Sequence, residues 1–268
     1  MNMTKNRFIG LAAALLFLAM PAFAYADNKA EAAIHGNKGN ELAQGAKYDE
    51  AIAEFTTAIT LSPKDERIYA DRGRVYRAAA KLGEAIGDFA KVIEIAPKSD
   101  VGYLERGQTL IVQNSYDLAL VDLNKAIEIN PNNPVSYDRR GYAFYNLKKY
   151  EDAIRDYTSS IEKKPDNPLT LSRRADAYVA MNQFAQAAPD LEAALKLKPD
   201  DFDTTQRLLY VKAKMAPPPR PVAVAPVAPV ATPKPPPEGM SMPIKIGIGV
   251  AALIVIVVIA VVLLRRKN

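Results

Sequence analysis

The sequence predicts an all-α solenoid, a stack of similar helix pairs, and three observations lead to that prediction. The first is a set of prolines spaced 34 residues apart, at Pro63, Pro97, Pro131, Pro165 and Pro199. The second is a similar short sequence that precedes each proline. The third is the spacing of apolar residues by three and four, which places them on single helix faces. A fixed period of this size is typical of a solenoid.

Two columns of residues define the repeating unit. A small residue recurs at the same position of each repeat, at Gly39, Gly73, Gly107, Gly141 and Ala175. A large apolar residue recurs later in each repeat, at Phe55, Phe89, Leu123, Tyr157 and Leu191. The small residue would let one helix approach its partner closely, and the large one would fill the remaining space. The proline then ends the second helix.

These columns resemble the tetratricopeptide repeat over residues 32–201. The five repeats are 32–65, 66–99, 100–133, 134–167 and 168–201. The resemblance implies a right-handed superhelix of helix-turn-helix units. Residue types that favour helix starts predict N-caps at Asp65, Asp100, Asn133 and Asn167. Residues 202–215 are expected to be the capping helix that such a stack requires, so the predicted solenoid is 27–215. Pro189 predicts that the second helix of repeat five starts late or is kinked.

The amino-terminal residues 1–26 have the pattern of a secretory signal peptide. Lys5 and Arg7 precede an apolar run from Phe8 to Met20, and small residues in an Ala-x-Ala pattern follow it. This order of charge, apolar run and cleavage pattern predicts export of the downstream chain.

The carboxyl-terminal part predicts one membrane span, 244–264. It contains an uninterrupted apolar run of 19 residues, 246–264, and the basic tail 265–268 follows it. The run matches the thickness of a bilayer, and the basic residues place the tail in the cytoplasm. The preceding segment 216–243 is rich in Pro, Ala and Val and is expected to be an extended linker. A cleaved sorting signal is the alternative for this terminus, although no LPxTG or Pro-Glu-Pro motif precedes the apolar run.

The composition argues against several classes of function. The formal net charge is +5, but the excess of basic residues lies in the two terminal regions, so no nucleic-acid partner is predicted. The chain has no Cys and one His. No P-loop, HExxH, GxSxG or dinucleotide-binding motif occurs. The sequence therefore predicts a protein that is not an enzyme, with no catalytic residues, cofactor or metal site.

Arginines and acids also recur at the repeat period. The arginine column is Arg72, Arg106, Arg140 and Arg174, and the acid column is Glu54, Asp88, Asp122, Asp156 and Asp190. One interpretation is a structural ladder of ion pairs that holds adjacent repeats in register. The other is an arginine track for phosphate or carboxylate groups. The spacing leaves open whether pairs form within a repeat or between repeats.

The resemblance further implies a concave groove lined by the first helices of the repeats, which would hold a peptide segment of a partner protein. Carried over by position, the candidate groove residues are Arg67, Arg74, Arg77, Leu104, Gln108, Ile111, Asp138, Tyr142, Tyr145, Asn146, Ser172 and Asp176. The Lys and Asn pattern with which related proteins bind chaperone carboxyl termini is absent.

Together these features predict an adaptor or scaffold that binds proteins and is tethered to a membrane. In a bacterium the repeats would lie in the periplasm, the single span in the inner membrane and the carboxyl terminus in the cytoplasm, where the protein could serve envelope complex assembly. The alternative is a structural envelope protein that associates with further copies of itself as a homo-oligomer.

Overall fold

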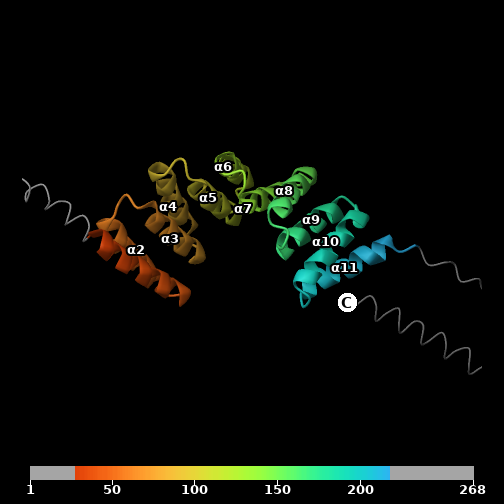
Figure 1. Ribbon diagram of the computed structural model, residues 1–268, viewed down its shortest axis with the longest axis horizontal. Helices are drawn as coiled ribbons and strands as arrows, with labels where there is room; N and C mark the ends of the chain where they lie inside the picture. The colour runs from red at the N-terminus through yellow and green to blue at the C-terminus, as the bar shows by residue number, and fades with distance from the viewer. Residues whose placement is uncertain (1–27, 218–268) are drawn as a thin grey trace, which may run out of the picture. The chain divides into compact units, whose positions relative to one another are not determined.

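The computed structural model describes residues 28–217, which form helices joined by short turns, with no strand in that range (Figure 1). The first helix covers residues 28–44. The others are α2 (Tyr48–Leu61), α3 (Glu66–Ala78), α4 (Leu82–Ile95), α5 (Asp100–Val112), α6 (Tyr116–Ile129), α7 (Pro134–Asn146), α8 (Tyr150–Lys163), α9 (Pro168–Ala180), α10 (Phe184–Leu197) and α11 (Phe202–Met215). The all-α prediction is confirmed over these residues.

The predicted signal peptide 1–26, nearly all of the linker 216–243, the span 244–264 and the tail 265–268 lie outside the described residues. Within 28–217, no helix combines the length and the apolar character that crossing a bilayer requires.

The first helices of repeats two to five each begin with a side-chain cap. Asp65, Asn133 and Asn167 each accept a hydrogen bond from the backbone N–H two residues further on, at 3.0–3.1 Å. The cap of α5 is Ser99 and not the predicted Asp100. The Asp100 carboxylate instead accepts hydrogen bonds from two asparagine side chains in the turn before α7, at 3.1 and 2.9 Å, so it links two successive turns.

The turn inside each repeat contains one residue in the left-handed region. These residues are Ala46, Ala80, Asn114, Lys148 and Asn182, with φ between 57° and 61°. The conformation ends the first helix and lets the chain reverse into the second. Only the two asparagines are suited to it, because a side chain with a β-carbon is strained there and asparagine tolerates the region best.

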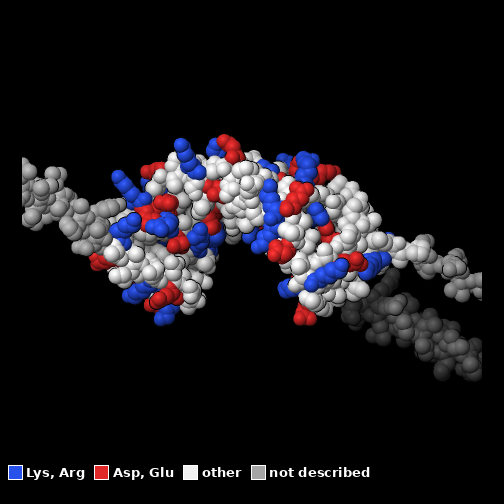
Figure 2. Space-filling model, in the orientation of Figure 1, with Lys and Arg blue, Asp and Glu red and all other residues white. Residues whose placement is uncertain are grey.

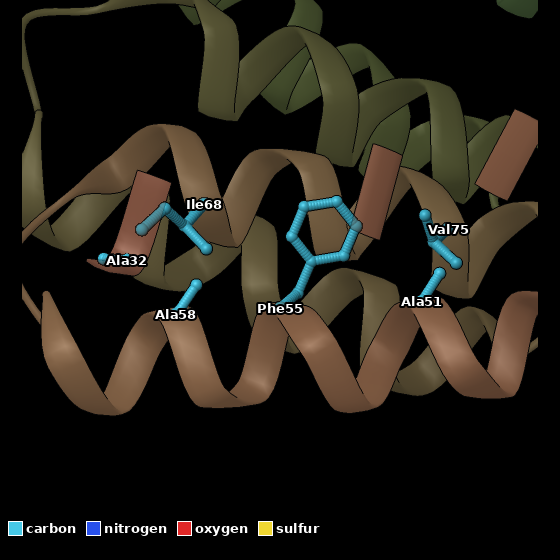
Figure 3. Close-up of a cluster of buried hydrophobic side chains, with 6 residues drawn as sticks. All are labelled: Ala32, Ala51, Phe55, Ala58, Ile68 and Val75. Atoms are coloured by element: carbon cyan, nitrogen blue, oxygen red, sulfur yellow. The ribbon is translucent and has the colours of Figure 1, made fainter. Parts of the chain in front are cut away.

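The small-residue column allows close approach of the two helices of each repeat, as predicted. A β-carbon added at Gly73 would lie 2.7 Å from Phe89 Cε1, and one at Gly39 would lie 2.9 Å from Phe55 Cε2. Both aromatic rings are fully buried. Figure 3 shows Phe55 projecting from α2 between its neighbours Ala51 and Ala58 in the core of the first repeat.

The arginine and acid columns form ion pairs within each repeat, from the first helix to the second. Arg72, Arg106, Arg140 and Arg174 each donate two hydrogen bonds of 2.7–2.8 Å to the aspartate 16 residues further on, which are Asp88, Asp122, Asp156 and Asp190. In the first repeat, Lys38 and His35 both contact Glu54 at 2.6 Å. The structural ladder is therefore the interpretation that the geometry favours.

Three of these arginines also reach the preceding repeat, which is how the ladder connects adjacent units. Arg72 donates to Thr56 Oγ1 at 2.9 Å, Arg140 to Asn124 Oδ1 at 2.8 Å and Arg174 to Thr158 Oγ1 at 3.0 Å. The corresponding residue for Arg106 is Ala90, which has no acceptor in its side chain. The bond between repeats is thus missing at this one position of the ladder.

The first helices of successive repeats touch one another and form one face of the stack, here called the inner face. Contacts join α3 to α5, α5 to α7 and α7 to α9, whereas no contact of similar extent joins successive second helices among those described.

Pro189 lies within α10, which begins at Phe184, so the predicted late start of this helix is wrong.

Candidate functional site

A cavity of about 420 Å³ opens on the inner face, and we call it the central cavity. It is lined by Arg77 of α3, by Gln108, Ile111 and Val112 of α5, by Asn114 and Tyr116 at the following turn, by Arg139 and Tyr142 of α7, and by Arg173 of α9. Three guanidinium groups therefore share one cavity with aromatic and aliphatic side chains, and none of the described residues that line it is acidic.

The central cavity lies where one column of the inner face changes its charge. Asp71 and Glu105 occupy this column in repeats two and three. Arg139 and Arg173 occupy it in repeats four and five, and Arg207 continues it in α11. Equivalent positions in adjacent repeats are neighbours in space, so the acidic and basic halves of the column meet at the cavity.

Arginines of α3 neutralise the acidic half. Arg74 Nε donates to Glu105 Oε1 at 2.7 Å, and a second nitrogen of the same guanidinium donates to Asp71 Oδ1 at 2.7 Å. The other oxygen of Glu105 lies 2.8 Å from a terminal nitrogen of Arg77. These contacts hold α3 against α5.

Two members of the basic half have acidic partners in the preceding repeat. Arg173 donates to Asp138 Oδ2 at 2.5 Å, and Arg207 lies 3.4 Å from Asp176 Oδ2. Burial raises the pKa of Asp176, and the two guanidinium groups near it oppose that rise. The ion pairs extend the contact between first helices toward α11.

Arg139 has no such partner among the described residues. In the repeat before Arg139, the positions that correspond to Asp138 and Asp176 are occupied by Leu104 and Gln108, and neither is charged. The acidic group that Arg139 contacts within 4.0 Å is Asp138, whose Oδ2 lies 3.4 Å from a terminal nitrogen of Arg139. The same oxygen already accepts a hydrogen bond from Arg173. The Nε atom of Arg139 is buried and has no hydrogen-bond partner in the described part of the chain. Burial and the nearby guanidinium groups of Arg173 and Arg77 lower the pKa of Arg139, and the Asp138 and Glu105 carboxylates oppose this.

Aromatic and aliphatic groups stand beside these charges. The Arg173 guanidinium lies 4.9 Å from the centre of the Tyr142 ring, within the range of a cation–π contact. Val112 is 56% exposed, and Ile111 is half-buried. Because apolar surface and three guanidinium groups lie together, the cavity is suited to a ligand that combines an apolar and an anionic group.

The structure brings four of the residues predicted from the sequence into the central cavity: Arg77, Gln108, Ile111 and Tyr142. Arg67 and Arg74 line a different hollow of about 310 Å³ between α3 and α5. There Arg67 is bound to its own helix cap, because it donates to Asp65 at 2.7 and 3.0 Å.

Other predicted residues serve packing. Leu104 packs against the core of repeat three, and Tyr145 against that of repeat four, where its ring lies 5.5 Å from that of Tyr150. Asn146 is half-buried and donates to the Tyr142 carbonyl at 2.8 Å. Asp176 is half-buried beside Arg207.

Asp138 and Ser172, expected to face the groove, are instead buried between adjacent first helices. Asp138 accepts a hydrogen bond from Thr170 Oγ1 at 2.9 Å, and the Ser172 hydroxyl lies 3.2 Å from Thr204 Oγ1. Each side chain contacts the first helix of the following unit, which is α9 for Asp138 and α11 for Ser172. They are therefore contacts between repeats and not parts of an open surface.

Sequence reasoning missed Arg139 and Arg173, the two arginines that give the cavity most of its charge. Each precedes an arginine of the ladder, and the doubled residue was assigned to the ladder alone. The signal that could have found them is the change from Asp71 and Glu105 to arginine in the same column.

On the face of the described residues that Figure 2 shows, Lys and Arg side chains are interspersed with Asp and Glu.

Two family models match parts of the chain. One, described as TPR repeat, matches residues 39–79 and 107–148, and another, described as tetratricopeptide repeat, matches residues 172–204. No curated protein matches the chain in sequence.

Solved structures share the fold. YrrB, described as a TPR protein with an unusual peptide-binding site, is 22% identical with a TM-score of 0.54, covering 72% of this chain and 97% of YrrB. A thermophilic TPR protein of Thermus thermophilus is 19% identical with a TM-score of 0.56, over 68% of this chain and 99% of that one. MamA of Desulfovibrio magneticus RS-1 is 17% identical with a TM-score of 0.57, over 64% and 97%. Tetratricopeptide repeats are therefore recognised at residues 39–79, 107–148 and 172–204, and the described residues share the fold of these solved structures.

Proposed function

We propose that this chain is a scaffold without enzymatic activity, whose inner face binds a peptide segment of a partner protein. The central cavity carries this proposal, because it joins side chains of α3, α5, α7 and α9 in one opening. Tyr142 and Ile111 supply apolar contact surface, and Gln108 adds an amide that can donate and accept hydrogen bonds. Such mixed surfaces with half-exposed tyrosines are typical of protein-binding sites.

We also propose that the repeats lie on the extracytoplasmic side of a bacterial inner membrane. The support is the sequence pattern of residues 1–26 and of 244–268, described above. Tethering would raise the concentration of the groove near partners in the same membrane without any catalysis.

Crosslinking in native membranes tests the groove. A photoreactive phenylalanine analogue at Tyr142 should capture a partner protein, and mass spectrometry should map the crosslink to one segment of that partner. The matched control is the same analogue at Leu118 of α6, which is 61% exposed and outside the cavity. Equal capture from both positions would contradict the groove, and capture of further copies alone would support the self-associating structural alternative.

Protease treatment tests the membrane topology. Protease added to intact spheroplasts should digest the repeats and leave an epitope fused after Asn268 protected. Protection of the repeats would contradict the proposed orientation. Recovery of a membrane-free chain that lacks residues 244–268 would instead identify a cleaved sorting signal.

A further inference from the structure

The inner face around the central cavity carries one more positive charge than its own acids compensate. Four guanidinium groups, of Arg74, Arg77, Arg139 and Arg173, lie near it. Three carboxylates, of Asp71, Glu105 and Asp138, contact them. Glu105 and Asp138 are each shared by two arginines, so neither fully compensates its partners.

The repeats themselves identify the uncompensated group. Arg139, Arg173 and Arg207 are equivalent residues, and the last two each meet a carboxylate from the preceding repeat. At those positions the repeat before Arg139 has Leu104 and Gln108, which carry no charge. The Nε atom of Arg139 is buried and lacks a hydrogen-bond partner among the described residues, as does Oε2 of Glu105, which lies 2.8 Å from Arg77. Arg139 is therefore the member of this column that is short of one acidic partner, and its side chain is 32% exposed and open to one from outside.

We infer that the central cavity binds one carboxylate of an acidic peptide segment, held by Arg139 with Arg77 and Arg173 beside it. This inference rests on the proposed function and specifies its ligand. The carboxylate would take the place that an aspartate of the preceding repeat takes beside Arg173 and Arg207. An apolar residue next to it in the peptide would contact Ile111, Val112 and Tyr142, which line the same cavity.

The surroundings favour a carboxylate in a peptide over a nucleic acid. The guanidinium groups around the central cavity exceed the carboxylates by one, and one carboxylate of a ligand balances that excess charge. Nucleic-acid binding needs a row of uncompensated basic residues along the surface, whereas Arg173 and Arg207 in this column are already paired with Asp138 and Asp176. The carboxylate can come from an Asp or Glu side chain or from a peptide carboxyl terminus, and the experiment separates these sources.

The experiment selects ligands from a phage library of random decapeptides, using the 268-residue chain in detergent as the target. The most enriched peptide is synthesised with fluorescein, and its affinity is measured by fluorescence polarisation. Three further versions carry Gln in place of each Asp or Glu, Lys in the same places, or an amidated carboxyl terminus. We expect removal of the bound carboxylate to weaken binding about tenfold or more, because a charge-assisted hydrogen bond is lost.

Two protein variants test the site from the other side. Arg139→Gln should weaken binding of the acidic peptide about tenfold or more, as expected for the loss of one charge-assisted bond. Gln108→Glu puts a carboxylate at the position that Asp176 holds beside Arg207, so it should weaken binding to a similar extent without lowering the melting temperature. This second variant keeps the test valid if Arg139→Gln unfolds. The control is Arg155→Gln on α8, whose side chain is 72% exposed and pairs with Asp152.

The outcomes separate the inference from the proposed function. If no peptide is enriched, both are overturned. If a peptide binds but its Gln and amidated versions bind equally well, or Gln108→Glu leaves its affinity unchanged, the carboxylate site is overturned and the peptide-binding groove stands. Loss of binding in the Gln version assigns the site to an acidic side chain. Loss in the amidated version alone assigns it to a carboxyl terminus.

Discussion

Arg140 and Asp156 are joined by two parallel hydrogen bonds of 2.7 Å that connect the first and second helix of repeat four. The remaining terminal nitrogen of Arg140 donates to Asn124 of the preceding repeat at 2.8 Å. One guanidinium thus holds together three helices, α6, α7 and α8. The same arrangement recurs at Arg72 and Arg174, but Arg106 lacks the third bond.

Arg140→Ala should therefore lower the free energy of unfolding by about 3 kcal/mol, because it leaves a buried carboxylate without its partner. Arg106→Ala should cost about 1 kcal/mol less, since it breaks no bond to the preceding repeat. Urea denaturation followed by circular dichroism measures both. Ala90→Thr, which supplies the missing acceptor, should stabilise the chain that carries Arg106 and have no such effect in the Arg106→Ala background. Equal costs for the two arginine variants would contradict the role of the third bond.

The cost of Arg140→Ala should depend on pH. Burial raises the pKa of Asp156, and Arg140 opposes that rise, so the pKa should be higher still in the variant. A carboxyl group whose pKa is raised in the folded state favours folding when it is protonated, and this contribution is lost as the pH rises through the folded pKa. The difference in stability between the native chain and the variant should thus be larger at neutral pH than in mild acid. A difference that is constant with pH would exclude Asp156 as its cause.

Two buried serines should respond in opposite directions to alanine. Ser136 is fully buried and its hydroxyl has no hydrogen-bond partner among the described residues. The equivalent Thr170 bonds Asp138, and the residue that corresponds to Asp138 one repeat earlier is Leu104, which has no acceptor. Ser136→Ala should raise the free energy of unfolding by about 1 kcal/mol. Ser172→Ala breaks the contact with Thr204 and should lower it by about 1 kcal/mol. Thermal melts of both variants decide the matter, and two changes of the same sign would refute this account.

Two helical glycines form another matched pair. Gly73→Ala puts a β-carbon 2.7 Å from the buried Phe89 ring and should cost about 1–3 kcal/mol. Gly87 in α4 has no atom within 4 Å of its added β-carbon. Gly87→Ala should therefore stabilise by about 0.5–1 kcal/mol, since alanine favours the helix. Chemical denaturation measures both, and a neutral Gly73→Ala would show that the helices can separate at little cost.

Replacing Ala80 by glycine should stabilise the fold. Its φ of 59° is strained for a residue with a β-carbon, so Ala80→Gly should raise the free energy of unfolding by about 0.5–1 kcal/mol. The neighbouring Ala79 has a φ of −80°, and Ala79→Gly should instead destabilise, because glycine there only adds freedom to the unfolded chain. Thermal melts compare the two variants, and reversal of this order would argue against the left-handed turn.

Periodicity was enough to predict the repeating unit and the two charged columns. A period of 34 residues repeats the local signals, so the helix pairs and the close approach of Gly73 to Phe89 could be found in one repeat and checked in the others. The spacing left open whether Arg140 pairs within its own repeat, and the structure decides that it does. Contacts inside a helix pair depend on spacing along the chain, and periodicity reports spacing directly.

The tertiary structure alone decided which inner-face residues are open. Asp138 and Ser172 were assigned to the groove by their position in the repeat, yet the first helix of the next unit covers both. Arg139 was not among the predicted groove residues, yet it lines the central cavity, and its acidic contact there is shared with Arg173. Such facts depend on how closely successive repeats pack and on which side chains differ between them, and a shared repeat pattern averages those differences away.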